Sequence, residues 1–175
     1  MGPTAAAFPS ARRLLRRLES VADPGTRLQH GVDALPALVA GCRQASITAV
    51  ETGRLRVCVA TGGTSRRTDE LQDDLDEGPC LQAVRTGHSV IAHDLLTETR
   101  WPVWRTAAID ELGVTAVLSV LLPSTRRPSS TLNLYSGTTD GLSSVDLAFL
   151  HTIAVPLSRA LLDLRSGAGR LGPAA

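Results

Sequence analysis

Two neighbouring runs of alternating residues constrain the fold of this chain more than any other feature. The runs cover residues 45–50 (ASITAV) and residues 55–60 (LRVCVA), and only the short connection ETGR separates them. One side of the second run carries three apolar residues, Leu55, Val57 and Val59, while the other side begins with Arg56. Alternation of this kind predicts strands with one buried face, and so short a connection predicts a β-hairpin.

Further patterns predict helices before and after these strands. Helices are expected at residues 10–22, 26–41, 79–86, 101–112 and 143–165, and further strands at 89–92, 114–122 and 132–135. Residues 61–74 are polar, and we expect them to be irregular apart from one helical turn at 69–73. Strands that are mostly joined by hairpins and flanked by helices favour an antiparallel sheet with a helical cover. The fold class predicted is therefore α+β, of the α/β sandwich type.

Capping residues and prolines predict the ends of three of these helices. Ser10 is expected to cap the first helix, Thr26 the second, through a capping box with Gln29, and Ser143 the last. Pro36 is expected to break the second helix early. Pro156 is expected to kink the last helix, because proline removes one backbone hydrogen bond.

The last predicted helix carries apolar residues at alternating spacings of three and four, which is the pattern of a coiled-coil seam. The predicted seam consists of Leu147, Leu150, Ala154, Leu157, Leu161 and Leu164. Together with the Arg/Leu amphipathic helix near the N-terminus, this seam suits the helical bundle of a homodimer.

Bulk composition limits the classes of function. A chain of 175 residues is one domain with short arms, and it has no apolar run of the ~18 residues that cross a bilayer. The net charge is +1 and aromatic residues make up 3%, so neither membrane nor nucleic-acid binding is expected. Three widely spaced cysteines fit a reducing cytoplasm. All basic residues are arginine, which is typical of a GC-rich genome.

Four segments in register resemble the GAF domains of actinobacterial GAF–ANTAR regulators. They are DELQ…DEGPCLQAVRTG within residues 69–87, DL…TRWP within 94–102, LGVTAVLSV at 112–120 and LNLYS at 132–136. The resemblance covers roughly residues 27–165. It implies a sheet of five or six mostly antiparallel strands, with helices packed on one face and a ligand pocket under loops on the other.

The resemblance also implies a division of the chain and a class of function. Residues 1–22 would be an N-terminal arm with the amphipathic helix, residues 23–165 the GAF-like domain, and residues 166–175 a flexible tail. GAF domains commonly sense small molecules, light or redox state and dimerise through terminal helices. The RNA-binding ANTAR module is expected to be missing, since the chain ends ten residues after Arg165. The signature of cyclic-nucleotide-binding GAF domains is also absent.

Cys80 is the most conspicuous candidate for chemistry. Gly78 and Pro79 begin a short helix, so the Cys80 sulfur lies near the positive end of the helix dipole, which favours thiolate. The acidic residues just before it raise the pKa of a thiol instead. We therefore expect a packed thiol that lines the ligand pocket. The full set of pocket candidates is Cys80, Trp101, Trp104 and Tyr135, although the two tryptophans would serve equally well as packing anchors.

An enzymatic alternative rests on the same cysteine. Free methionine-(R)-sulfoxide reductases are GAF domains with a Gly-Val-Cys-Gly motif near this place, and Cys80 is similar to that position. Their chemistry needs a further cysteine, and residues 88–122 contain none. His88 and His93 are too poorly spaced to indicate a metal site. The sequence therefore predicts no catalytic residue, no metal and no enzyme activity, and it names no cofactor.

The function predicted from the sequence is a sensor or regulatory domain in transcriptional or signalling control. It would bind a small molecule or a partner, signal through the terminal helices of a homodimer, and depend on a protein partner for its output. A ligand-free dimerisation or docking module is the alternative, and thiol-based reduction of methionine sulfoxide is a third possibility.

Overall fold

A five-stranded antiparallel sheet forms the centre of the computed structural model, which describes residues 7–124 and 129–168. The strands are β1 (Gln44–Glu51), β2 (Arg54–Ala60), β3 (Val90–Ala92), β4 (Ala116–Leu121) and β5 (Ser130–Ser136). Their order across the sheet is β2-β1-β5-β4-β3, and every neighbouring pair is antiparallel. The predicted α+β fold is confirmed.

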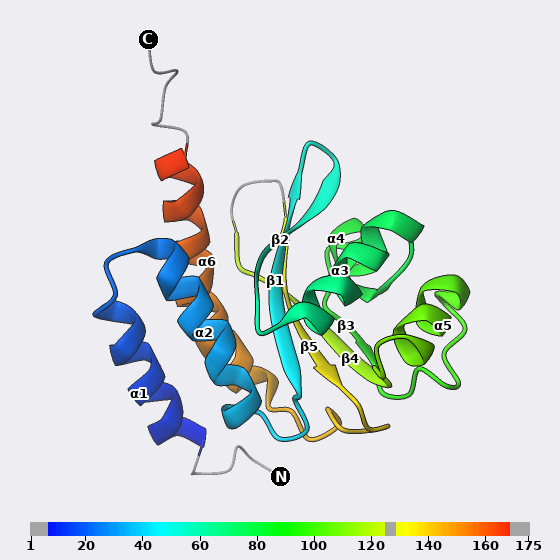
Figure 1. The fold of residues 1–175 in the computed structure, drawn as a ribbon. Helices are drawn as coiled ribbons and strands as arrows, with labels where there is room; N and C mark the ends of the chain where they lie inside the picture. Colours follow the sequence, from blue (N-terminus) through cyan, green and yellow to red (C-terminus); the bar gives the residue numbers. More distant parts are fainter. Residues whose placement is uncertain (1–6, 125–128, 169–175) are drawn as a thin grey trace.

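Helices cover both faces of this sheet (Figure 1). On one face lie α1 (Ala7–Glu19), α2 (Pro24–Leu38) and α6 (Leu147–Ala168). On the other lie α3 (Gly63–Leu75), α4 (Pro79–Thr86) and α5 (Pro102–Asp110). We call these last three helices the cover.

The β1–β2 hairpin turns at two residues with left-handed backbone. Thr52 has a φ of 50° and Gly53 a φ of 83°, between the paired residues Glu51 and Arg54. Two successive residues with positive φ are what a tight type I′ turn requires, and this turn matches the twist of the strands. The hairpin expected from the alternating sequence is therefore present.

The sheet face under α2 and α6 is apolar. Ala45, Ile47 and Ala49 of β1 are fully buried there with Leu132 and Leu134 of β5. Because side chains alternate along a strand, these positions share one face, and the residues between them point to the cover. The first core of the protein lies between this face and the helices α1, α2 and α6.

The predicted dimer seam on α6 is corrected by this packing. Of its six residues, four lie in the first core of the chain itself: Leu150, Ala154, Leu157 and Leu161, all at most 3% exposed. Leu164 is half-buried against the same core, whereas Leu147 is 50% exposed. The spacing of three and four marks the side of α6 that packs on α2 and the sheet, because an intramolecular helix face has the same period as a coiled coil.

The packing of α6 also matters for interpreting its apolar sequence. The stretch Leu147–Gly167 is long and apolar enough to cross a membrane, with a mean hydropathy of 1.4 in its most apolar window. Of that window, 44% is buried inside the protein, where α6 packs on α2 and the first core.

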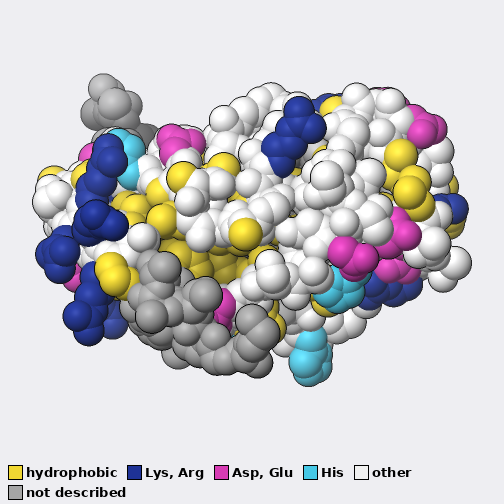
Figure 2. Space-filling model, turned by 90° about the horizontal axis from the view of Figure 1, so that it is seen from below, with side chains coloured by type: hydrophobic (Ala, Val, Ile, Leu, Met, Phe, Trp, Pro, Cys, Tyr) yellow, Lys and Arg dark blue, Asp and Glu magenta, His cyan; other side chains and the backbone are white. Residues whose placement is uncertain are grey.

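Helix α1 packs on α2 and α6 through Ala11, Leu14 and Leu18, which are buried in the first core. Its arginines, from Arg12 to Arg17, stay exposed and contribute to the basic side chains that gather at this end of the molecule (Figure 2). The predicted amphipathic helix is present, but it begins at Ala7, so Ser10 is not its cap.

Two other helix starts also differ from the sequence prediction. Asp23, rather than Thr26, caps α2 and accepts the Thr26 backbone N–H at 2.7 Å. Asp146, rather than Ser143, caps α6 and accepts backbone N–H groups of the first turn. In both places a carboxylate accepts the free N–H groups, an interaction that the helix dipole also favours.

The other differences concern helix continuity. Pro36 does not end α2, which runs on to Leu38, and α6 likewise continues past Pro156. The segment expected to be irregular at 61–74 is mostly helix, since α3 runs from Gly63 to Leu75. Four of the five residues that α3 buries are polar: Ser65, Thr68, Asp69 and Gln72. An apolar period therefore could not reveal this helix.

We expect Leu157→Ala to destabilise the monomer. Removing a fully buried leucine between α2 and α6 should lower the free energy of unfolding by about 2–4 kcal/mol, measured by urea titration. The matched control is Val155→Ala, on the exposed side of α6, with an expected loss below about 0.5 kcal/mol. Equal losses for the two variants, or a Leu157→Ala loss that vanishes on dilution, would show that the seam serves a dimer instead.

Candidate functional site

The second face of the sheet is buried under the cover, yet it is polar. Cross-strand pairing aligns Ser46 of β1, Asn133 of β5 and Ser119 of β4 in one row. A neighbouring row contains Thr48 and Thr131. All five side chains are fully buried. Buried polar side chains are costly unless they have hydrogen-bond partners, so a polar row at the centre of a sheet marks a candidate binding site.

Asp69 of α3 lies over this row and is fully buried. Its Oδ1 atom accepts hydrogen bonds from Tyr135 OH at 2.5 Å, from Asn133 Nδ2 at 2.9 Å and from Gln72 Nε2 at 3.4 Å. Its Oδ2 atom has no hydrogen-bond partner among the described residues. Ser46 faces this carboxyl and helps to lower its pKa, but its own Oγ forms no hydrogen bond of good geometry.

Burial dominates the protonation of Asp69. It raises the pKa of this carboxyl from 3.8 to about 7, despite hydrogen bonds that favour the charged form. Burial and the nearby Asp69 also raise the pKa of Tyr135 well above its usual value. Asp69 therefore changes its charge near neutral pH, a property that is common in functional sites.

Cys80 of α4 extends the network along the second row. Its Sγ atom is 3.0 Å from Thr48 Oγ1 and 2.9 Å from Thr131 Oγ1. The thiol is completely buried, and burial, followed by the charge of Asp69, raises its pKa to about 12. The expected packed thiol is present, and it is protonated at neutral pH.

Side chains around the α3–α4 connection tie the three cover helices together. Gln72 Oε1 accepts the backbone N–H of Cys80 at 2.8 Å, at the start of α4. Gly78 has a φ of 133°, and a Cβ there would lie 2.3 Å from Gln72 Oε1, so only glycine fits. Glu77 Oε2 accepts the backbone N–H groups of Val103 and Trp104 at the start of α5. As predicted, Gly78 precedes α4 and Gly87 ends it.

The two tryptophans lie apart from the polar network. Trp101 and Trp104 meet edge to face, with ring centroids 6.0 Å apart, in an apolar cluster between α3, α5 and the sheet. Trp104 Nε1 donates to the carbonyl of Thr68, which joins α5 to α3. Of the four predicted pocket residues, Cys80 and Tyr135 belong to the network, while Trp101 and Trp104 pack in the cover.

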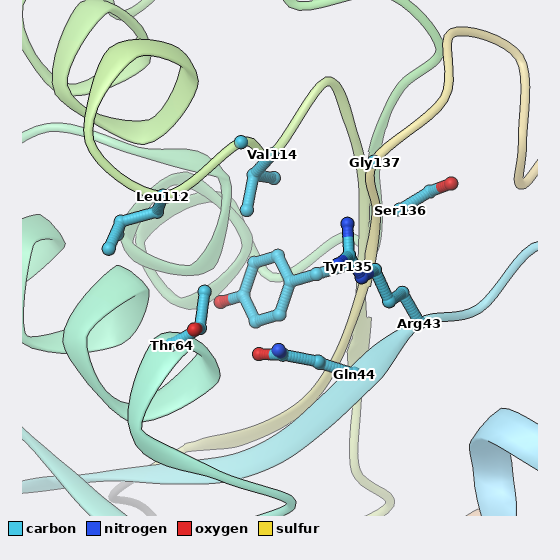
Figure 3. A pocket seen from close by; sticks show the side chains of 9 residues that line it. Arg43, Gln44, Thr64, Leu112, Val114, Tyr135, Ser136 and Gly137 are labelled. Carbon is cyan, nitrogen blue, oxygen red and sulfur yellow. The ribbon is translucent and has the colours of Figure 1, made fainter.

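A small cavity adjoins the network at Tyr135 (Figure 3). Its volume is about 60 Å³, and its wall includes Gln44, Thr64 and Val114 around the Tyr135 ring, with Arg43 near Ser136. The Oε1 atom of Gln44 is buried and has no partner among the described residues. This volume holds a few water molecules and is well below the ~300 Å³ of a typical ligand pocket.

Sequence reasoning missed most of the network. Asp69 and Gln72 were placed in a single helical turn within a segment expected to be irregular, and no role was given to Thr48, Asn133 or Thr131. A usable signal was present, because the strands around Thr48 and Asn133 alternate apolar with small polar residues. Such alternation is read as exposure to solvent unless a cover for that face is known. No group of three or more His, Cys, Asp or Glu suited to a metal occurs in the described parts of the chain.

Comparison with known proteins gives a family and a set of structural relatives. A family model described as GAF domain matches residues 21–162. No curated protein matches the chain. The GAF domain of an Acinetobacter phosphoenolpyruvate-protein phosphotransferase has a TM-score of 0.71 at 15% identity, and the match covers 95% of this chain and 99% of that one.

Free methionine-R-sulfoxide reductases share the fold as well. The enzyme from Neisseria meningitidis, solved with its substrate, has a TM-score of 0.69 at 17% identity over 95% of this chain and 96% of its own. The type II enzyme from Thermoplasma acidophilum has a TM-score of 0.66 at 18% identity over 80% and 93%. These findings correct the prediction that the chain is not an enzyme. Its fold serves catalysis in these proteins, so the fold gives no ground for excluding an activity.

We expect the stability of the protein to fall as the pH rises from about 4 to about 7, because of Asp69. The folded state holds the Asp69 proton up to about pH 7, whereas the unfolded chain releases it near 3.8. The folded state therefore loses roughly 4 kcal/mol across this window. Asp69→Asn should remove this loss, measured as the difference in free energy of unfolding between variant and wild type.

Asp73→Asn provides a control, because Asp73 changes the stability of the protein with pH in the opposite direction to Asp69. Although partial burial opposes it, hydrogen bonds from Arg54 and the Leu55 backbone lower the pKa of Asp73. This carboxylate stabilises the fold at neutral pH, and its contribution is lost as the pH falls below about 4. The prediction for Asp69 is wrong if both variants show the same pH dependence.

Proposed function

The chain belongs to the GAF domain family, and from this premise we propose that it is a regulatory domain that binds a small polar molecule between the sheet and the cover. One observation carries the proposal: Asp69 Oδ2 and Asn133 Oδ1, on the polar face of the sheet, are both buried and without hydrogen-bond partners among the described residues. Each such atom costs free energy, which a ligand with matching groups would recover. We also propose that the chain is most similar in role to the GAF domains of actinobacterial GAF–ANTAR regulators, and that it acts in the cytoplasm.

The small volume of the cavity limits how a ligand enters. A space of about 60 Å³ admits a molecule of only a few heavy atoms unless the cover moves outward. Because α3 contacts both β1 and β2, a ligand that shifts α3 also acts on this edge of the sheet. Helix α6 contacts the same hairpin through Arg165, whose Nη2 donates to the carbonyl of Val50 at 3.2 Å. This contact offers a route from the site to the C-terminal helix.

The signal would pass to a homodimer through an exposed side of α6 that shares Leu147 with the predicted seam. Leu147, Val155 and Leu162 are the large apolar residues that α6 exposes. Their spacings of eight and seven place them on one side of the helix. We propose that a second copy packs on this side and that a partner protein supplies the output.

Native mass spectrometry of the freshly purified chain tests the proposal. We expect a dimer that carries a small non-covalent mass, because the unpartnered groups favour retention of a ligand. Asn133→Leu should lose the added mass, while Thr106→Ala, on the exposed side of α5, should keep it. A folded wild type with no added mass in any preparation, and with no binding to a metabolite mixture, would refute the ligand.

Thiol-based reduction of a small sulfoxide is a second candidate. The observation that favours it is a thiol, Cys80, in the same hydrogen-bonded network as an acid, Asp69, that is half protonated near pH 7. Sulfur attack on the sulfoxide, with protonation of its oxygen, yields a thioether and a sulfenic acid on Cys80. Two external thiols then return Cys80 to its thiol and release water and a disulfide.

Turnover of free methionine sulfoxide with dithiothreitol as reductant decides this candidate. The wild type and Cys58→Ser should be active and Cys80→Ser inactive, because Cys58 lies on β2, outside the network. Activity that survives Cys80→Ser, or a folded wild type without activity, excludes the reductase.

A further inference from the structure

Two of the unpartnered atoms on the polar face can only accept hydrogen bonds. A carboxylate oxygen of Asp69 and an amide oxygen of Asn133 are buried without a donor. Gln44 Oε1, at the adjoining cavity, is in the same state. The hydroxyls of Ser46 and Ser119 lack partners too, but a hydroxyl can donate or accept. The two oxygens on this face that can only accept are therefore available to a ligand that donates hydrogen bonds.

The charge on this face is also unbalanced. No ion pair joins Asp69 to a basic residue within the described residues, although this side chain has no exposed surface. Arg66 lowers the pKa of Asp69 by its charge, but Arg66 itself is exposed. A buried carboxylate is stable when a cation accompanies it, and otherwise it takes up a proton.

Building on the ligand-binding function proposed above, we infer that the ligand is a small organic cation with at least two N–H donors. An alkylammonium or an amidinium fits this description. One N–H would donate to Asp69 Oδ2 and another to Asn133 Oδ1, and the charge would neutralise the carboxylate. An anionic ligand would meet acceptors and a like charge instead.

The composition of the site agrees with such a ligand. Asp69 and Asn133 do not line the cavity of about 60 Å³ beside Tyr135, whose wall includes Arg43, so a cation reaches their unpartnered oxygens only when the cover moves outward. A divalent metal would need several charged ligands, whereas Asp69 is the carboxylate that lies over the polar row.

Thermal unfolding of the full chain at about pH 8 tests the inference with two probes, methylammonium chloride and acetamidinium chloride. At about ten times the dissociation constant, a probe that binds the folded state should raise Tm by about 3 °C. Sodium chloride and sodium acetate at equal ionic strength should change Tm much less. Asp69→Asn should abolish the effect, and Asp73→Asn should retain it, since Asp73 faces Arg54 on the surface instead.

Three results would overturn the inference. One is a wild type that responds to neither probe. Another is a full response to sodium ions alone, which would assign the site to an inorganic cation. The third is a co-purified ligand that is neutral or anionic, which would leave the proposed binding function intact and refute only the class of ligand named here.

A second measurement avoids dependence on the folding of Asp69→Asn. The proton and the cation compete for one carboxylate, so the affinity of wild type for acetamidinium should rise about tenfold per pH unit up to about pH 7 and then level off. The other groups that act on or face Asp69 are Tyr135, Cys80, Cys58 and the arginine Arg66. The pKa of Tyr135 is raised well above its usual value, that of Cys80 to about 12 and that of Cys58 to about 11. A flat pH profile contradicts the inference.

Discussion

The position of the cover depends on the hydrogen bonds of one buried carboxyl group, that of Asp69. One oxygen gathers hydrogen bonds from β5 and from the next turn of its own helix, which fixes α3 over the sheet. Gln72 then bonds to the start of α4, and the adjoining connection supplies Glu77 to the start of α5. The apolar half needs no such anchor, because α2 and α6 pack on it by close contact between aliphatic side chains.

The sequence predicts the apolar side of the sheet better than it predicts helix α3, which covers the polar face. The hairpin, the short helix after Gly78 and the antiparallel sheet follow from alternation and from turn residues, which are local properties. Helix α3 does not, because the side that it buries is polar and its period is invisible to a hydrophobicity pattern. The seam on α6 has the right period but the wrong partner, since a repeat cannot say whether its contact lies in the same chain. Local rules failed where the chain assembles a candidate site, as expected of functional regions.

The division of the sheet into an apolar and a polar face also accounts for the likeness both to the GAF domain of a phosphotransferase and to reductases. The apolar face determines the fold, and many residue combinations satisfy it, which is consistent with identities of 15–18% beside TM-scores of 0.66–0.71. The polar face carries the candidate site, where single side chains would decide which chemistry is possible. In this chain they include a thiol with a high pKa and a carboxylic acid that titrates near neutrality.

The bonds from Gln72 and Glu77 to the starts of α4 and α5 have a kinetic consequence. A helix that loses the acceptors for its first N–H groups exposes them at once, so neither helix leaves the sheet without disturbing its neighbour. The three helices therefore open as one cooperative unit rather than by fraying singly. Any molecule that reaches the polar face must wait for that collective event, so its association rate reports the frequency of opening and becomes independent of concentration once the molecule is abundant.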